Sequence, residues 1–459
     1  MYDAWKARYL IPAGTEPDGH PRYRVEHGDD ATVSEGQGYG MILAAYMAGH
    51  DPEAQTVFDG LWEFALDHPS IYDGRLMDWY VRGDDQPDTV GDDSAFDGDC
   101  DMAYALLLAQ RQWGDGGRFD YGAEAARVLA GVMASTVGPQ SHLPLLGDWV
   151  SGDPDYDQWT PRTSDFMPDH FRSFAAVTGD PAWTAVADAC LATVAQVQQD
   201  YSPATGLLPD FLVPVTPGGP PLQPAPSWFL EGPDDGRYDY NACRDPWRLA
   251  TAFLVQGDTL AGGQARRMAR WLHTATGGDP ALVRAGYDLD GSVQADGDYF
   301  TTAFAAPFAV ACMTDPALQS FLNALYDSIV DSHENYYEDS LTALCLIVLS
   351  GNWWAPEQTT VAAPTPPPAV RLDLPRPNPF NAAVCLSFRL ATAAPVRLAI
   401  VDAAGRRVRR LLDGELPAGR HAVTWRGRDD RGRRCAAGVY TAVLESGGGS
   451  ERRRIVLVP

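Results

Sequence analysis

Apolar residues recur every three or four positions through most of the first 354 residues, in stretches separated by loops rich in Gly, Pro and Asp. This spacing is typical of helices with one buried face. It predicts twelve helices, over residues 2–10, 36–49, 53–68, 99–112, 122–136, 168–178, 181–199, 246–255, 264–275, 302–313, 316–331 and 339–350. The spacing alone also fits a helical solenoid, but the sequence shows no repeating period. We therefore expect an all-α domain of paired helices closed into an (α/α) toroid.

The pattern changes after a segment rich in Pro, Ala and Thr. Residues 355–372 predict an extended linker between a helical domain at 1–354 and a second domain at 373–459. In the second domain apolar and polar residues alternate over VCLSFRLA, VRLAIVDA, HAVTWRG, VYTAVLE and RRRIVLVP, with Gly and Asp turns between them. Such alternation predicts a small, all-β antiparallel sandwich.

The charge of the chain is unevenly spread. The formal net charge is -26, yet residues 361–459 hold 17 Arg and no Lys against 8 Asp plus Glu, a net of +9. The remainder carries 18 basic and 53 acidic residues, a net of -35. An acidic body of this kind repels nucleic acid and attracts cations, so it indicates either a solvated surface or a cationic substrate. We find no apolar run of about 18 residues and expect no membrane span.

Seven cysteines are scattered along the chain, and none forms a CxxC pair. Buried free thiols explain them better than a zinc site or a disulfide framework. Only Cys385 and Cys435, both in the second domain, suggest a pair, and the suggestion is weak. We expect neither a metal nor a cofactor.

Glu35 lies in the first acidic cluster, in the run VSEGQGYGMILAAYMAG. Apolar neighbours there would raise the pKa of its carboxyl, as a general acid requires. A glutamate favoured by the dipole at a helix N-terminus explains the position equally well.

Two further clusters carry carboxylates. Asp97, Asp99 and Asp101 alternate at the start of a predicted helix, where N-capping and calcium binding are alternatives to catalysis. The loop over residues 214–241 is long for a compact domain and holds Glu231 among aromatic residues. Aromatic faces beside a carboxylate suit sugar rings, although core packing is the more common role for each aromatic residue singly.

These segments resemble glycoside hydrolase family 8 over residues 2–354, with SEGQGYGM, DGDCDMAYALLLAQRQWG and the spacing between them carrying the resemblance. The resemblance implies an (α/α)6 barrel of inverting, endo-acting enzymes. It implies that Glu35 is the proton donor and that Asp97 binds and distorts the sugar at the cleavage site. The substrate-binding residues would be Trp79, Trp149, Asp165, Phe166, Tyr240, Asn241, Arg244, Tyr336 and Tyr337.

The general base departs from the cellulase branch of that family. That branch carries Asp in a Tyr-Asp-Ala-x-Arg context, whereas this chain has Asn241, and a neutral amide cannot deprotonate water. The chain resembles instead the chitosanase and lichenase branch, which takes its base from a glutamate on an inserted loop. FLEGPDDG then supplies Glu231, with Asp97, Asp234 and Asp235 in reserve. An inverting pair implies carboxyls about 6.5–9.5 Å apart.

The substrate prediction follows the branch and the charge. An acidic body, and Asp165 in the groove, favour chitosan, since a carboxylate can pair with a glucosamine ammonium. The alternative role of Asp165 is to cap the helix that starts at Pro168. Mixed-linkage β-glucan or cellulose, cleaved by the same mechanism, is the alternative substrate. A catalytically inactive glycan-binding protein is a third possibility, motivated by Asn241.

The second domain resembles the Ig-like domain of flagellar hook-capping proteins and the sorting domains of type IX secretion. PNPFN, VRLAIVDAAGRRVRRL, LPAGRHAVTW and AAGVYTAVL carry the resemblance. It implies a secreted or cell-surface protein, with possible contact to secretion machinery or to anionic envelope glycans. We accordingly expect that a leader peptide is missing from the start of this sequence.

Overall fold

The computed structural model describes residues 1–83, 91–153, 155–357 and, with short gaps at 373–374, 376–377, 379, 391–392, 403–405, 418, 437 and 447–448, residues 370–458. The chain divides into two compact units, Met1–Gln358 and Thr359–Pro459. Each unit is described by itself.

The twelve helices predicted in the first unit are all present among the described residues. They are α1 (Tyr2–Tyr9), α2 (Ser34–Tyr46), α3 (Ala54–Asp67), α4 (Phe96–Trp113), α5 (Tyr121–Ser135), α6 (Pro168–Thr178), α7 (Ala182–Asp200), α8 (Asp245–Gln256), α9 (Thr259–Thr276), α10 (Thr302–Cys312), α11 (Gln319–Ile329) and α12 (Tyr336–Leu349).

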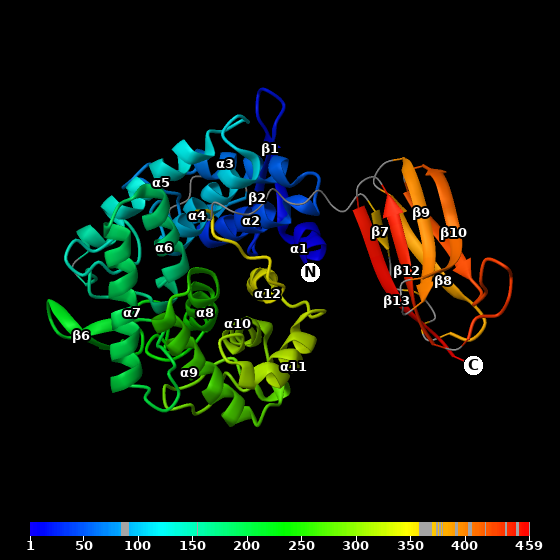
Figure 1. Cartoon of the computed structure of the whole chain (residues 1–459). Helices are drawn as coiled ribbons and strands as arrows, with labels where there is room; N and C mark the ends of the chain where they lie inside the picture. Colours follow the sequence, from blue (N-terminus) through cyan, green and yellow to red (C-terminus); the bar gives the residue numbers. More distant parts are fainter. Residues whose placement is uncertain are drawn as a thin grey trace. The chain divides into compact units, whose positions relative to one another are not determined.

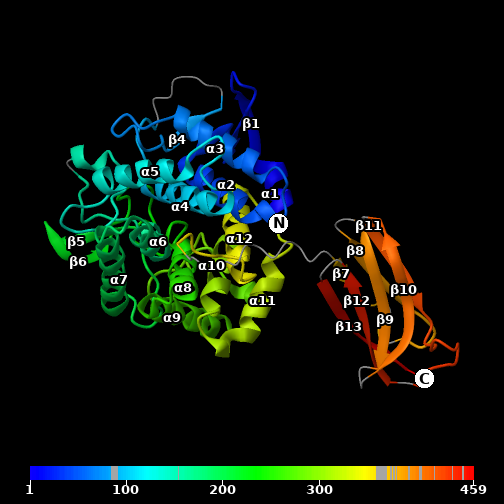
Figure 2. The ribbon, with the colours of Figure 1, turned by 45° about the horizontal axis from the view of Figure 1, so that its top comes forward.

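Even-numbered and odd-numbered helices form two concentric layers of a closed ring, the predicted (α/α)6 toroid (Figures 1 and 2). The inner helices contact one another in the order α2, α4, α6, α8, α10 and α12, and α12 contacts α2 again. Each outer helix packs on an inner neighbour, as α3 does on α2 and α1 on α12. Because an outer helix returns the chain after each inner one, the inner helices run in the same direction. Their N-terminal ends therefore gather at one rim.

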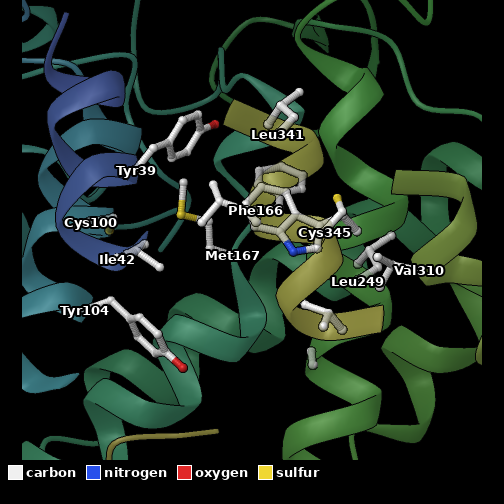
Figure 3. Packing of buried hydrophobic residues seen from close by; sticks show 14 of the residues in the cluster. Tyr39, Ile42, Cys100, Tyr104, Phe166, Met167, Leu249, Val310, Leu341 and Cys345 are labelled. Atoms are coloured by element: carbon white, nitrogen blue, oxygen red, sulfur yellow. The ribbon is translucent and has the colours of Figure 1, made fainter. Parts of the chain in front are cut away.

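The inner helices are buried on nearly all sides, as an inner layer requires. All residues of α10 are buried, and α2 is buried from Gly36 to Ala45. Side chains from α2, α4, α8, α10 and α12 meet in the core of the ring (Figure 3).

Three two-stranded antiparallel sheets interrupt the helical pattern, and two of them are hairpins. They pair β1 (Leu10–Thr15) with β2 (Pro21–Val25), β3 (Ala31–Val33) with β4 (Tyr80–Arg82), and β5 (Leu212–Thr216) with β6 (Gly219–Pro224). The long loop predicted from residue 214 therefore begins as a hairpin, because its Pro and Gly residues form the turn and the edge of a two-stranded sheet.

The second unit is the predicted antiparallel sandwich. One sheet has the order β10-β9-β12-β13 and the other β11-β8-β7. The strands are β7 (Val370–Leu372), β8 (Val384–Leu390), β9 (Ala394–Asp402), β10 (Arg407–Leu416), β11 (Gly419–Trp425), β12 (Gly438–Ser446) and β13 (Gly449–Leu457). Inward residues such as Phe388, Ile400 and Trp425 form its core.

Two features of the second unit differ from the prediction. Strand β7 lies inside the predicted linker, so the sandwich begins earlier than residue 373. Strand β10 was not predicted, because its arginines and two register shifts break the alternation. All seven cysteines are free, as predicted, and the pair suggested for Cys385 and Cys435 does not form. None of the helices in the described ranges is both long and apolar enough to cross a membrane.

Candidate functional site

A pocket of about 560 Å³ opens at the rim where the inner helices begin. Its lining brings together Glu35, Asp97 and Glu231, which lie far apart in the sequence. The other lining residues are Val33, Ser34, Trp79, Asp93, Ser94, Ala95, Leu146, Trp149, Tyr156, Arg162 and Leu230.

Glu35 occupies the first turn of α2, and the glycines that follow it explain its position. A Cβ at Gly38 would lie 2.8 Å from the Cβ of Asp101, and one at Gly98 would lie 2.5 Å from the carbonyl carbon of Ser34. Residues larger than glycine would therefore push α2 and α4 apart. This close crossing sets Glu35 beside Asp97.

The carboxyl of Glu35 is positioned as a proton donor. Its Oε2 accepts a hydrogen bond from Arg244 Nη1 at 2.5 Å, and its Oε1 accepts one from the Tyr336 hydroxyl at 3.3 Å. Burial raises the pKa of Glu35 to about 7, against the lowering effect of Arg244 and with a raising contribution from Asp97. A large fraction of the group therefore keeps its proton at neutral pH, and Oε1, which accepts only the longer hydrogen bond from Tyr336, is the oxygen that carries it.

Asp97 has the opposite character. Although burial opposes its ionisation, the charges of Arg244 and Arg162 hold the pKa of Asp97 below its usual range. Its Oδ2 lies 2.8 Å from Arg244 Nη1 and 3.7 Å from Arg162 Nη1. The two neighbouring carboxyls therefore differ in protonation at neutral pH. Glu35 can act as an acid, and ionised Asp97 can stabilise the positive charge that develops on the sugar ring.

Asn241 and Arg244, just before α8, connect the acid to the base. Arg244 Nη2 donates to the Asn241 Oδ1 at 2.9 Å, and Asn241 Nδ2 donates to Glu231 Oε2 at 2.8 Å. The amide orientation follows from its partners, because a guanidinium can only donate and a carboxylate can only accept. Three hydrogen bonds therefore join Glu35 to Glu231.

The loop that carries Glu231 is held from inside by Asp235. The carboxylate of Asp235 accepts hydrogen bonds from the backbone N–H groups of Leu230 at 2.7 Å, Glu231 at 3.1 Å and Gly232 at 2.9 Å. Asp235 is 3% exposed, whereas the side chain of Glu231 is 48% exposed. Glu231 is thus a solvent-reaching carboxyl on a fixed backbone, as the activation of a water requires.

Two charged residues of the site, Arg162 and Asp210, were not predicted from the sequence. Arg162 lies between Asp97 and Glu231, with its Nη2 3.5 Å from Glu231 Oε1. Asp210 is buried and accepts hydrogen bonds from the backbone N–H groups of Asn241 at 3.2 Å and Ala242 at 2.7 Å. Both residues lie in segments that resemble the family, RTSDFM and LLPDF, but only the fold shows their partners.

Aromatic side chains flank the carboxyls. Trp79 and Trp149, which the resemblance places in the substrate groove, line the pocket together with Tyr156. Tyr336 contacts Glu35, while the hydroxyl of Tyr337 donates to the backbone oxygen of Tyr240 at 2.5 Å. These tyrosines therefore surround the acid and the segment before α8.

Asp165 and Phe166 do not reach the pocket, which corrects their expected place in the groove. Asp165 is 1% exposed, and within the described ranges neither of its carboxyl oxygens has a hydrogen-bond partner, so it does not cap α6 either. Burial raises the pKa of Asp165 to about 7, with Arg162 opposing. Phe166 packs in the core of the ring beside Met167 (Figure 3). Both side chains are buried, although they stand just before α6, an inner helix.

Asp234 and Asp235, the alternative candidates for the general base, have other partners. Asp234 forms an ion pair with Arg237 at 2.9 Å, and Asp235 holds the loop. Among the described residues no group of three or more His, Cys, Asp or Glu is placed to hold a metal ion.

Comparison with protein families matches both units. The model described as Glycosyl hydrolases family 8 matches residues 1–351, and the model described as FlgD Ig-like domain matches residues 380–450. The first match covers well over half of the chain.

Individual relatives agree with that match. A Beta-glucanase of Niallia circulans is 42% identical over 355 residues, covering 77% of this chain and 84% of that protein. An Endoglucanase of Bacillus sp. (strain KSM-330) is 38% identical over 363 residues, covering 77% and 76%. The apo structure of a Beta-1,3-1,4-glucanase from Paenibacillus sp. X4 superposes with a TM-score of 0.73 at 42% identity, covering 77% of this chain and 91% of that one.

Proposed function

The chain belongs to glycoside hydrolase family 8, and from that premise we propose that it is an inverting, endo-acting hydrolase of β-1,4 bonds in mixed-linkage β-glucan. The observation that carries the proposal is the hydrogen-bonded connection of Glu35 to Glu231 within one pocket. It gives one protonated carboxyl, one solvent-reaching carboxyl and a groove with aromatic sides.

Glu35 acts as the general acid. Arg244 occupies its Oε2, so the proton leaves from Oε1 to the glycosidic oxygen. Asp97, held ionised by Arg244 and Arg162, faces the positive charge that develops on the sugar ring as the bond breaks. The departing sugar thus leaves as a neutral alcohol.

Glu231 acts as the general base. Asn241 fixes one of its oxygens, and the exposed side chain leaves room for a water on the opposite face of the sugar from Glu35. Removing a proton from that water while Glu35 donates one gives a single displacement and inverts the anomeric centre. Asn241 therefore orients the base and does not replace it.

The glucan substrate is supported by the relatives and by the burial of Asp165. A beta-glucanase and a beta-1,3-1,4-glucanase, each 42% identical, are among the similar proteins. The acid that favoured chitosan in the sequence lies behind the pocket instead of in it. The proposal therefore replaces the expectation of chitosan with its β-glucan alternative.

Chitosan remains the second candidate because of Asp93. This residue lines the pocket, and burial, together with the charges of Asp148, Asp78 and Asp92, raises its pKa to about 7. An ammonium group in the pocket would favour ionisation of Asp93 and could pair with it.

Reducing-end release from barley β-glucan, lichenan, carboxymethyl cellulose, xylan and chitosan tests the proposal. We expect the highest kcat/KM on the mixed-linkage glucans, and loss of activity in Glu35→Gln and Glu231→Gln. A preference for chitosan that disappears in Asp93→Asn would favour the second candidate. No release from any polymer would instead indicate a glycan-binding protein.

We also propose that the second unit serves export or surface attachment. The match to an Ig-like domain and the basic composition of residues 361–459 support this role. Fractionation of the source cells tests it, because enzyme confined to the cytoplasm would contradict export.

A further inference from the structure

Trp228 stands out on the turn that carries the base. It is 73% exposed, more than any other tryptophan among the exposed large hydrophobic side chains. Its φ of 62° lies in the left-handed region, where a bulky residue is strained. An exposed tryptophan in a strained backbone adds little to the core, so its presence calls for a role outside the fold.

The turn around Trp228 is fixed on both sides. The Trp228 N–H donates to the backbone oxygen of Gly232 at 2.7 Å, which closes a tight turn over Glu231. Phe229 packs inward against Phe211 and Tyr156, and the Tyr156 hydroxyl donates to the Phe229 oxygen at 2.9 Å. Trp228 is therefore the outward side of a rigid turn whose inward side forms the pocket.

This arrangement places a large apolar ring near the base but outside the lining of the pocket. Residues on the same turn, Leu230 and Glu231, are part of that lining. Aromatic faces stack on the CH faces of pyranose rings, while the hydroxyl groups of the sugar stay in water. The turn therefore presents an exposed aromatic side chain within three residues of the base.

We propose that Trp228 is a sugar-binding surface at the mouth of the pocket, which stacks on a pyranose ring of the glucan chain beyond those that the pocket holds. The proposal rests on the proposed function, because it takes the same polysaccharide as the ligand. Its effect falls on affinity for long chains, since the ring neither donates nor removes a proton.

Three variants separate binding from strain. Trp228→Ala removes the ring and keeps a side chain at a positive φ; Trp228→Gly removes both the ring and the strain; Trp228→Phe keeps an aromatic face. Tyr326→Ala, at an exposed aromatic position on α11, is the matched control.

We expect KM for polymeric β-glucan to rise about three- to tenfold in Trp228→Ala and Trp228→Gly, from the loss of one aromatic contact. The rise should be smaller on an oligosaccharide short enough to fit the pocket, and smaller in Trp228→Phe. Trp228→Gly should melt about 1–3 °C above Trp228→Ala, because only glycine adopts this φ without strain. Tyr326→Ala should match the wild-type protein.

An unchanged KM in Trp228→Ala overturns the proposal, and so does a fall in kcat alone, which would give Trp228 a purely structural role on the turn. If the wild-type protein hydrolyses no polymer, the proposed function fails separately. Affinity electrophoresis through gels that contain each polymer then decides: weaker retention of Trp228→Ala supports the binding surface, and equal retention refutes it.

Discussion

The general base should still work when its carboxylate is moved by mutation from position 231 to position 241. Asn241 Nδ2 lies 2.8 Å from Glu231 Oε2, so a carboxylate at position 241 would lie within one hydrogen-bond length of the carboxylate that serves as the base. In the double variant Glu231→Gln with Asn241→Asp, the amide and the carboxylate exchange places. The hydrogen bond between them is kept, with Gln donating and Asp accepting.

The surroundings of position 241 accept the exchange. Arg244 Nη2, which donates to Asn241 Oδ1 at 2.9 Å, can donate equally to an aspartate. Asp210 Oδ2 lies 3.3 Å from Asn241 Nδ2, and burial raises the pKa of Asp210 to about 8. At neutral pH Asp210 therefore carries a proton that it can donate to the new carboxylate, and the two groups need not repel.

The expected magnitudes follow from the role of the base. Loss of a general base costs about 10²–10⁴-fold, so Glu231→Gln should raise the barrier by about 3–5 kcal/mol. The double variant should be at least about tenfold more active than Glu231→Gln. It should stay less active than the wild-type protein, because Asp is one methylene shorter than Glu. Asn241→Asp alone should lose activity, since two carboxylates at this distance cannot both ionise.

Reducing-end release by the four proteins, at equal concentration and with folding checked by thermal melting, measures these differences. Asp234→Asn is the control and should keep its activity. A folded double variant no more active than Glu231→Gln would refute the view that positions 231 and 241 face the same water. Full activity in Glu231→Gln would refute the base itself.

Three further predictions concern the acid and the packing beneath it. Because Glu35 must be protonated and its pKa is about 7, kcat/KM should fall as the pH rises through about 7; a midpoint two units lower would contradict this role. Gly98→Ala should cost about 1–3 kcal/mol or more in unfolding free energy, and should lower activity as well, because its Cβ meets Ser34; an unchanged urea midpoint would be inconsistent with the close crossing. Arg248→Met leaves buried Asp101 without its 2.6 Å partner and should cost about 3–5 kcal/mol at pH 7. Since the folded-state pKa of Asp101 is lowered to about 2, this pair stabilises the fold above about pH 4, and urea unfolding should show the difference shrinking as the pH falls toward 2.

The helical ring could be predicted from the sequence because its signal is local and repeated. Twelve stretches with helical spacing predict twelve helices, and the near-continuous apolar run after Glu35 matches an inner helix. The three two-stranded sheets could not be predicted, since strands of three to six residues leave no alternation long enough to recognise. Strand β10 could not be predicted for a related reason. It lies at the edge of its sheet, and its arginines do not mark a buried face.

The site was only partly predictable, because its organisation depends on the direction in which each side chain points. A charged residue before an inner helix can face the rim or the interior, and the sequence does not distinguish Arg244, which reaches Glu35, from Asp165, which does not reach the pocket. Arg162 and Asp210 resemble ordinary surface charges in the sequence. Their roles come from partners far along the chain, such as Glu231 and Asn241.

The amide at position 241 shows how the acid and the base depend on each other. Arg244 lowers the pKa of Glu35, and the same guanidinium fixes the Asn241 Oδ1 that turns the amide N–H toward Glu231. The charge that tunes the acid therefore also belongs to the group that orients the base, through two hydrogen bonds. An aspartate at 241 would keep the bond to Arg244 but place a second negative charge beside Glu231. A neutral amide is thus the group that lets one arginine serve both carboxyls while Glu231 stays free to take a proton.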